Sequence, residues 1–287
     1  FMGGPSKVIV ERVQTSDNIS DALERLKNKR WYYLAVPGLG DGETDTVVEY
    51  IKEQRTQYHK TFKAVLPLAA ADNEGIINFA TDNIKIAAKT YTTAEFCCRI
   101  AGILAGLPLN RSSTYYTLPE IESITESETP DDDVDNGKLI LINDGTKIKI
   151  ARGVNSLTTT TEDKGEDFKK IKIIEAVDMI RDDIRATFED EFVGKVENSY
   201  DNKIVFIAAV NKYFKDLANR GVLYDKYDNK AEIDIDETRE WLSKTRDVSS
   251  WDDEKIKTAN TGTNVFVRAS IQIQDAIEDL KFGIYIE

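Results

Sequence analysis

Apolar positions in residues 1–110 alternate between the spacing of a strand and the spacing of a helix. Short apolar runs predict strands, and longer runs with apolar residues three or four positions apart predict helices. The expected strands are 7–13, 31–36, 62–68, 76–79 and 84–88. The expected helices are 19–29, capped by Ser16 or Asp17, then 44–58 and 94–106. This β-α-β-α-β order predicts an α/β layer with a partly parallel sheet.

Residues 138–192 carry the clearest pattern. The apolar run 139–142 and the alternating run 147–150 flank an Asn-Asp-Gly turn, which predicts a β-hairpin. A long helix follows, because one apolar residue recurs at every third or fourth position. Its predicted stripe comprises Ile173, Val177, Ile180, Ile184, Phe188 and Phe192.

Beyond residue 200 the pattern predicts further helices and strands. A helix is expected over 203–218, followed by a short helix at "ETREWLSK" and a strand over 265–273. A helical turn or a bulge is expected over 275–279. The predicted apolar face of the 203–218 helix comprises Val205, Ala209, Tyr213 and Leu217.

Several stretches in a fixed order carry a family resemblance. They are "GLPLNRSSTYYTLPEIESI", "INDGTKIKIARGVNSLTTTT", "DFKKIKIIEAVDMIRDDI" and, last, "VFVRASIQIQDAIEDLKFGIYIE". In this order the sequence resembles contractile tail sheath proteins of myovirus-type phages and phage-tail-like bacteriocins. The resemblance covers residues 138–287 well and 1–120 more loosely.

The resemblance implies a structural subunit that assembles as stacked hexameric rings around a tail tube and contracts without nucleotide hydrolysis. It implies an outer α/β domain, 1–110, an acidic connector, 111–137, and a conserved α+β core domain, 138–287, with an extending C-terminal strand. Implied partners are further sheath subunits, the tube protein, and baseplate and tail terminator proteins. Assembly in the bacterial cytoplasm is implied, followed by release in a virion tail or bacteriocin. An N-terminal arm is expected to be missing before Phe1.

Net charge is unevenly distributed. The chain carries a formal charge of −13, and residues 111–137 hold eight acidic side chains and one basic side chain. We expect residues 120–136 to be exposed and to contribute nothing to a core. Without clustered Lys and Arg, a nucleic-acid partner is disfavoured. An EF-hand loop that starts at Asp131 needs glycine at its sixth position and glutamate at its twelfth, where this chain has Asn136 and Ile142. A calcium site is therefore not predicted.

The loop Gly38–Gly42 suggests an alternative function. A strand, a glycine loop and a helix N-terminus in this order can bind a nucleotide, which would make the chain a nucleotide-binding α/β enzyme. The spacing is G-x-G-x-G, however, and no Gly-Lys-Ser/Thr follows. Asp41, Glu43 and Asp45 would also place negative charge where a phosphate binds. A plain strand-to-helix turn therefore fits the loop better.

No other residue assembles into recognisable chemistry. His59 is the only histidine, so no histidine-based catalytic set can form without it. The Asp182–Asp183 pair and the threonines 158–161 fit exposed surface. Adjacent Cys97 and Cys98 rarely bridge and fit buried small hydrophobes of a reducing compartment. We predict no catalytic residue, no cofactor and no metal.

The segment Phe282–Glu287 alternates apolar residues without a turn that would pair it with the preceding strand. An unpaired strand is a template for joining another sheet. By resemblance, Phe282, Ile284 and Ile286 would face the sheet of a neighbouring subunit; the alternative is pairing within the same chain. No apolar run approaches the roughly 20 residues of a membrane span, so membrane insertion is not predicted.

Overall fold

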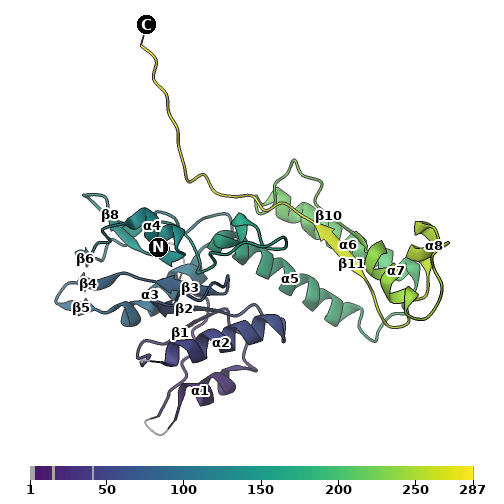
Figure 1. The fold of residues 1–287 in the computed structure, drawn as a ribbon, viewed down its shortest axis with the longest axis horizontal. Coiled ribbons are helices and arrows are strands. Elements are labelled where there is room, and N and C mark those ends of the chain that lie inside the picture. The colour runs from purple at the N-terminus through teal and green to yellow at the C-terminus, as the bar shows by residue number, and fades with distance from the viewer. Residues whose placement is uncertain (1–3, 15–16, 41, 287) are drawn as a thin grey trace. The chain divides into compact units, whose positions relative to one another are not determined.

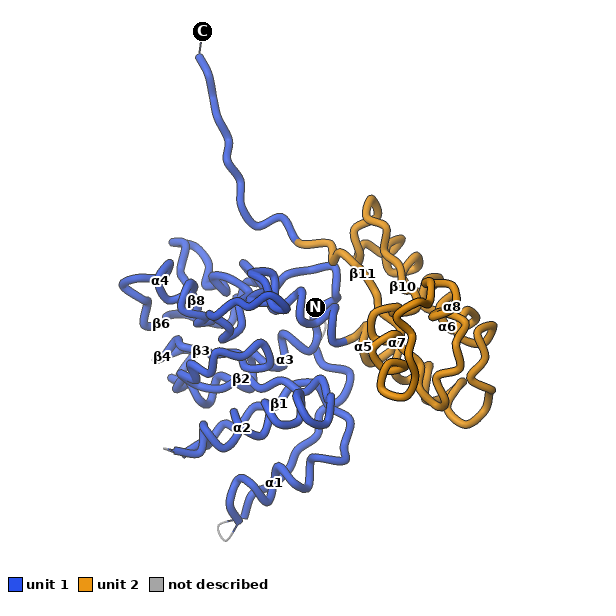
Figure 2. Tube along the Cα trace, turned by 45° about the vertical axis from the view of Figure 1, so that its right-hand side comes forward, with its two compact units in different colours: residues 1–178, 276–287 blue, residues 179–275 orange. Residues whose placement is uncertain are grey.

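The computed structural model describes residues 4–14, 17–40 and 42–286 and separates into two compact units (Figures 1 and 2). Unit 1 comprises residues 1–178 and 276–287, and unit 2 comprises 179–275. The boundary between the two units therefore falls between Asp178 and Met179, within a helix, whereas the predicted connector between domains is 111–137. The division into an outer domain, a connector and a core domain stays a prediction.

Unit 1 is built on a parallel sheet. The sheet has the order β1-β2-β3-β7, and every neighbouring pair is parallel. Its strands are β1 (Tyr33–Ala35), β2 (Lys63–Pro67), β3 (Ile76–Phe79) and β7 (Lys138–Leu139). The predicted partly parallel sheet is confirmed, and β2 and β3 are almost continuously buried, as strands covered on both faces are.

Helices cover both faces of this sheet. Ala64 and Leu66 of β2 pack in one apolar cluster with α1 (Ile19–Leu26) and α2 (Glu43–Thr56). Val65, between them, packs in a second cluster with α3 (Thr93–Gly106). Because successive strand residues point to opposite faces, β2 lies in the middle of a three-layer arrangement.

The cap of α1 differs from the expectation. Asn18 accepts a hydrogen bond from the Asp21 amide at 2.9 Å, and the Asp21 carboxylate accepts one from the Asn18 amide at 3.2 Å. Asp17 instead pairs with Arg25 at 3.3 Å, and Ser16 lies outside the described residues. The reciprocal Asn–Asp pair satisfies two amides at once, as a capping box does.

The predicted strand 7–13 is wrong. Residues 7–13 form no strand, and Val8 and Val10 are exposed. Glu11 holds this segment near α1 through ion pairs with Arg25 and Lys29. Polar and apolar residues do alternate in 7–13, but this segment pairs with no strand in the described part of the chain.

The region 80–150 adds two small antiparallel sheets. One has the order β5-β4-β6, and the other is the predicted hairpin of β8 and β9. Leu139, the first residue of the run expected in the hairpin, instead belongs to β7 of the parallel sheet. The strands are β4 (Asp82–Ile86), β5 (Lys89–Tyr91), β6 (Ser123–Thr125), β8 (Leu141–Asn143) and β9 (Ile148–Ile150).

The acidic connector is more ordered than expected. It contains β6 and the short helix α4 (Pro130–Asp135), and Ile121 belongs to the apolar core of unit 1. The prediction that residues 120–136 stay outside a core is therefore wrong at Ile121. Asp131 and Asp132 are exposed as expected, whereas Asp133 pairs with Lys138 at 2.7 Å.

A 3-10 turn, Glu166–Lys169, leads into the predicted long helix α5 (Ile171–Glu191), which continues from unit 1 into unit 2. The other elements of unit 2 are α6 (Tyr200–Asn219), β10 (Lys230–Ile233), α7 (Ile235–Ser243), α8 (Asp253–Thr258) and β11 (Val267–Ser270). β10 and β11 pair antiparallel. Residues 275–279 form no helical turn.

The buried face of α6 is not the predicted one. Its buried residues are Lys203, Phe206, Ile207, Val210, Phe214 and Leu217. Of the predicted face only Leu217 is buried, and Val205 is 58% exposed. The reason is a second apolar stripe, in which Phe206 packs edge-on against Phe188 and Phe192 with ring centroids 5.1 Å apart.

Candidate functional site

The end of the described chain presents unpaired apolar residues. Phe282, Ile284 and Ile286 are 77%, 74% and 94% exposed, and residues 280–286, called the terminal segment below, belong to no strand. Figure 1 shows this segment as an extended chain without a neighbouring strand. In the described residues, the segment therefore does not pair within its own chain; Glu287 lies outside them.

The residues just before the terminal segment are held by side chains of unit 1. Glu278 accepts a hydrogen bond from the Ser112 hydroxyl at 2.7 Å and pairs with Arg152 at 3.2 Å. Arg152 also pairs with Asp279. These contacts attach residues 278–279 to two loops of unit 1, the loop between α3 and β6, which holds Ser112, and the loop after β9, which holds Arg152.

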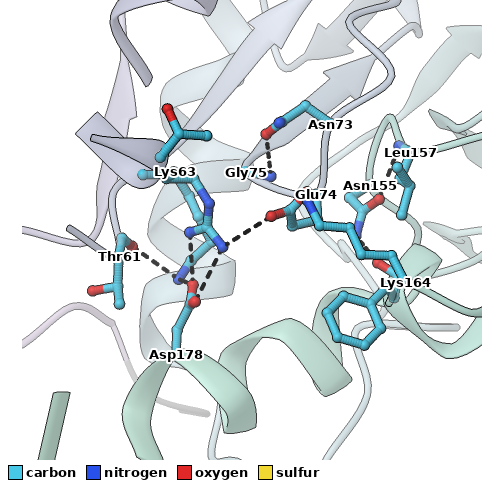
Figure 3. A network of polar contacts seen from close by, with 12 residues as sticks. Thr61, Lys63, Asn73, Glu74, Gly75, Asn155, Leu157, Lys164 and Asp178 are labelled. Carbon is cyan, nitrogen blue, oxygen red and sulfur yellow. Dashed lines mark hydrogen bonds and ion pairs between the residues drawn. The ribbon is translucent and has the colours of Figure 1, made fainter. Parts of the chain in front are cut away.

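A network of buried charges lies at the beginning of β2 (Figure 3). The carboxylate of Asp178, in α5, accepts hydrogen bonds from Arg55 of α2 at 2.9 and 3.1 Å and from Lys63 of β2 at 3.0 Å. The side chains of Lys63 and Asp178 are only 1% and 3% exposed. The bidentate contact with Arg55 and the ammonium of Lys63 satisfy the buried carboxylate from two sides.

Further carboxylates complete this network. Glu175, one turn before Asp178, pairs with Lys63 at 3.1 Å and accepts a hydrogen bond from the Tyr33 hydroxyl. The carboxylate oxygens of Glu74 lie 3.6 Å from the Arg55 guanidinium and 2.9 Å from the Lys164 ammonium. Three cations and three carboxylates thus meet, which leaves the network without net charge.

Burial and pairing shift the pKa values in this network in opposite directions. Burial disfavours the Lys63 ammonium, but Glu175 and Asp178 outweigh it and raise the pKa of Lys63. Burial also disfavours the Asp178 carboxylate, but Lys63 and Arg55 outweigh it and lower the pKa of Asp178. Lys63 and Asp178 therefore both stay ionised near neutral pH.

The glycine loop has the geometry of a strand-to-helix turn. Gly42, with φ 85°, precedes α2 in the left-handed conformation that glycine adopts without strain. The Gly40 amide donates to the Glu43 carboxylate at 2.7 Å. A carboxylate of the same chain therefore occupies the position where a phosphate would bind; Asp41 lies outside the described residues.

The remaining candidate residues are dispersed. His59 is exposed beyond the end of α2, and Asp183 accepts a hydrogen bond from Tyr213 at 2.6 Å. Cys97 is buried, which raises the pKa of its thiol to about 12, whereas Cys98 is exposed, contrary to the expectation that both are buried.

The threonine run has a partner that the sequence did not suggest. The backbone amides of Thr159 and Thr158 donate to Asp72 and lower the pKa of this carboxyl to about 2. Throughout the described ranges, no group of three or more His, Cys, Asp or Glu side chains could hold a metal ion. Nor is any helix there long and apolar enough to cross a membrane.

Sequence reasoning missed the buried network and the contacts of Arg152. A signal was present for the network, since Lys63 interrupts the apolar run of β2 and Asp178 interrupts the apolar part of α5. A charge inside a buried run requires a counter-charge. No comparable signal marks Arg152, which is one of several arginines in polar surroundings.

Comparison with known proteins identifies the family of the chain. Residues 13–156 match the phage tail sheath protein central domain, and residues 163–287 match the phage tail sheath C-terminal domain. The tail sheath protein of Clostridium phage phiCD119 is 38% identical over 283 residues, covering 98% of this chain and 79% of that protein.

Solved structures show the same fold. The sheath tail protein of Desulfitobacterium hafniense matches with a TM-score of 0.68 and 22% identity, covering 75% of this chain and 52% of that one. The helical sheath of the anti-feeding prophage in its contracted state matches with a TM-score of 0.66 and 12% identity, covering 96% and 76%. This chain thus spans about half of the D. hafniense protein. Together with the matches along the sequence, these likenesses confirm the predicted resemblance: the chain belongs to the phage tail sheath protein family.

Proposed function

We propose that this chain is the repeating subunit of a contractile sheath. Copies of it form hexameric rings that stack around a tail tube, and contraction drives the tube through a target cell envelope without nucleotide hydrolysis. Membership of the sheath family supports this role, as does the fold shared with the contracted anti-feeding prophage sheath. The observation that carries the proposal is the exposed, unpaired terminal segment.

The terminal segment joins the sheet of a neighbouring subunit. Its backbone N–H and C=O groups supply the ladder of hydrogen bonds, and alternate side chains fill the neighbour's apolar surface. Phe282, Ile284 and Ile286 share one face of an extended strand. Burying each would contribute about 1.5–3 kcal/mol, enough together to hold subunits to one another.

The other partners follow from the same role. The sheath contacts the tube protein on its inside and baseplate and tail terminator proteins at its ends. The predicted core domain, 138–287, lies nearer the tube and the predicted outer domain, 1–110, farther from it. Assembly takes place in the bacterial cytoplasm before release. The subunit performs no catalysis, in keeping with an Asp178 carboxylate that is buried and paired with both Arg55 and Lys63.

Deleting residues 282–287 tests the role of the terminal segment. We expect the full chain to form tubes or rings in electron micrographs, and the truncated chain to form none while it stays folded, with an unchanged circular dichroism spectrum and melting temperature. Loss of folding stability would show instead that the segment belongs to its own domain.

A matched pair of full-length variants sharpens this test. Replacing Phe282, Ile284 and Ile286 by serine should abolish assembly, whereas Tyr285→Ser, on the opposite face of the strand, should weaken it far less. Equal effects of the two changes would contradict the proposed orientation of the strand.

A further inference from the structure

The polypeptide changes units just before the terminal segment. In unit 2, the Gln274 amide donates a backbone hydrogen bond to the Val222 carbonyl at 2.9 Å. From Ala276 onward the chain belongs to unit 1. The terminal segment follows the last strand of unit 2 in sequence, yet it starts from unit 1 in space.

The contacts at 278–279 account for this change. Arg152 spans the carboxylates of Glu278 and Asp279, and the Ser112 hydroxyl binds Glu278 from a second loop. We call these four residues the Arg152 clip. Its carboxylate at Glu278 is 17% exposed, and Arg152 is 29% exposed. Two loops of unit 1 therefore hold the chain from two directions.

The apolar side chains on both sides of the Arg152 clip are exposed to solvent. Ile277 is 98% exposed and Leu280 is 84% exposed. Hydrophobic burial therefore does not fix the root of the terminal segment, and the polar contacts of the clip remain as the attachment at 278–279.

We propose that the Arg152 clip is a positioning device that attaches the root of the terminal segment to unit 1. The strand offered to a neighbouring subunit then moves with unit 1 and not with unit 2. This inference rests on the proposed function. Opening the clip would free residues 277–279 and add about 10 Å of reach, at about 3.3 Å for each extended residue.

The attachment can be measured within one chain. Native Cys98 is exposed on α3 of unit 1, and a second cysteine placed at Leu280 reports the residue after the clip. Spin labels are attached to both cysteines in the full-length protein, which is diluted with an excess of unlabelled chain so that only distances within one chain are measured. We expect a narrow distance distribution for the parent protein and a distribution broadened by up to about 10 Å for Arg152→Gln.

Arg268→Gln is the matched control. Arg268 also pairs with two carboxylates, Glu232 at 2.9 Å and Asp236 at 3.2 Å, but within unit 2. This variant should leave the distribution narrow. Combining Arg152→Glu with Glu278→Lys and Asp279→Lys restores opposite charges and should narrow it again. An unchanged distribution in Arg152→Gln, or equal broadening in both arginine variants, would overturn the proposal.

Assembly provides the second readout. We expect Arg152→Gln to raise the protein concentration needed for assembly roughly tenfold, because the root must then be ordered on binding. Arg268→Gln should not raise it; an equal rise in both variants would contradict the proposal. The spin-label distances test the clip even if the terminal segment proves unnecessary for assembly, so the two proposals can fail separately.

Discussion

Lys63 illustrates how a single residue constrains its surroundings. It lies inside a parallel strand with its side chain 1% exposed, where an unpaired ammonium would cost several kcal/mol. Asp178 and Glu175 supply the compensating charge from α5, and Arg55 orients Asp178 from α2. One buried cation thus ties together three elements that are distant in sequence.

Replacing Asp178 by asparagine should be strongly destabilising. It leaves Lys63 and Arg55 with one carboxylate fewer between them, and breaking a buried pair from one side costs about 3–5 kcal/mol. Urea unfolding followed by Trp31 fluorescence measures the loss, because Trp31 stacks on Phe62 beside Lys63 at 3.8 Å. Trp241 and Trp251 are first replaced by phenylalanine.

Asp190→Asn is the control for this change. Asp190 is an exposed aspartate of the same helix, and its replacement should alter the free energy of unfolding by less than about 0.5 kcal/mol. Similar losses in the two variants would mean that the buried network contributes little.

The network also predicts a pH window for unit 1. Folding lowers the pKa of Asp178 below its ordinary 3.8, so its contribution is present above pH 3.8 and is lost as pH falls below that value. Folding raises the pKa of Lys63 above its ordinary 10.5, so its contribution is full below pH 10.5 and is lost at higher pH. The Trp31 unfolding midpoint should therefore drop at both extremes. In Asp178→Asn, the decrease of the unfolding midpoint at acid pH should be smaller. If the decrease is unchanged, carboxyl groups other than Asp178 cause it.

At the scale of elements, the two faces of α6 make a direct comparison possible. Phe214 is fully buried, and Phe214→Ala should destabilise unit 2 by about 3–5 kcal/mol. Val205→Ala should cost less than about 1 kcal/mol, since Val205 is largely solvated. Thermal unfolding followed by Trp241 and Trp251, with Trp31 replaced, reports unit 2. A larger effect at Val205 would favour the face that the spacing first suggested.

The elements themselves were predictable, but several of their partners were not. The parallel sheet, the hairpin and α5 follow from local periodicity and turn residues. The face of α6 does not, because its sequence holds two apolar stripes and the choice between them depends on Phe188 and Phe192. The strand expected at 7–13 fails for the same reason: alternation predicts a strand only where another strand pairs with it.

The same limit applies to the candidate sites. The terminal segment could be predicted because its alternation and the family resemblance point to the same residues. For the buried network, Lys63 inside an apolar run indicates that a counter-charge is needed, but not which residue supplies it, because Arg55 and Asp178 are 123 positions apart in sequence. Arg152 and Glu278 are 126 positions apart. Such pairs depend on the topology of the whole chain, which local spacing does not encode.

On the scale of the whole molecule, family domains and compact units divide the chain differently. The C-terminal sheath domain begins at residue 163, whereas unit 1 extends to Asp178. The first turns of α5 therefore belong to one domain by sequence and pack with the other. The ion pairs of Asp178 with Arg55 and Lys63 join the two family domains within one core.

The terminal segment also bears on the fate of a newly made chain. Phe282-Gly-Ile-Tyr-Ile286 combines high β-propensity with no charge and no proline, the composition of segments that seed aggregates. Lys281 and Glu287 flank it with opposite charges, as gatekeeper residues do. A chain that presents this segment is thus exposed to self-association, because the same backbone groups can pair between copies of the segment.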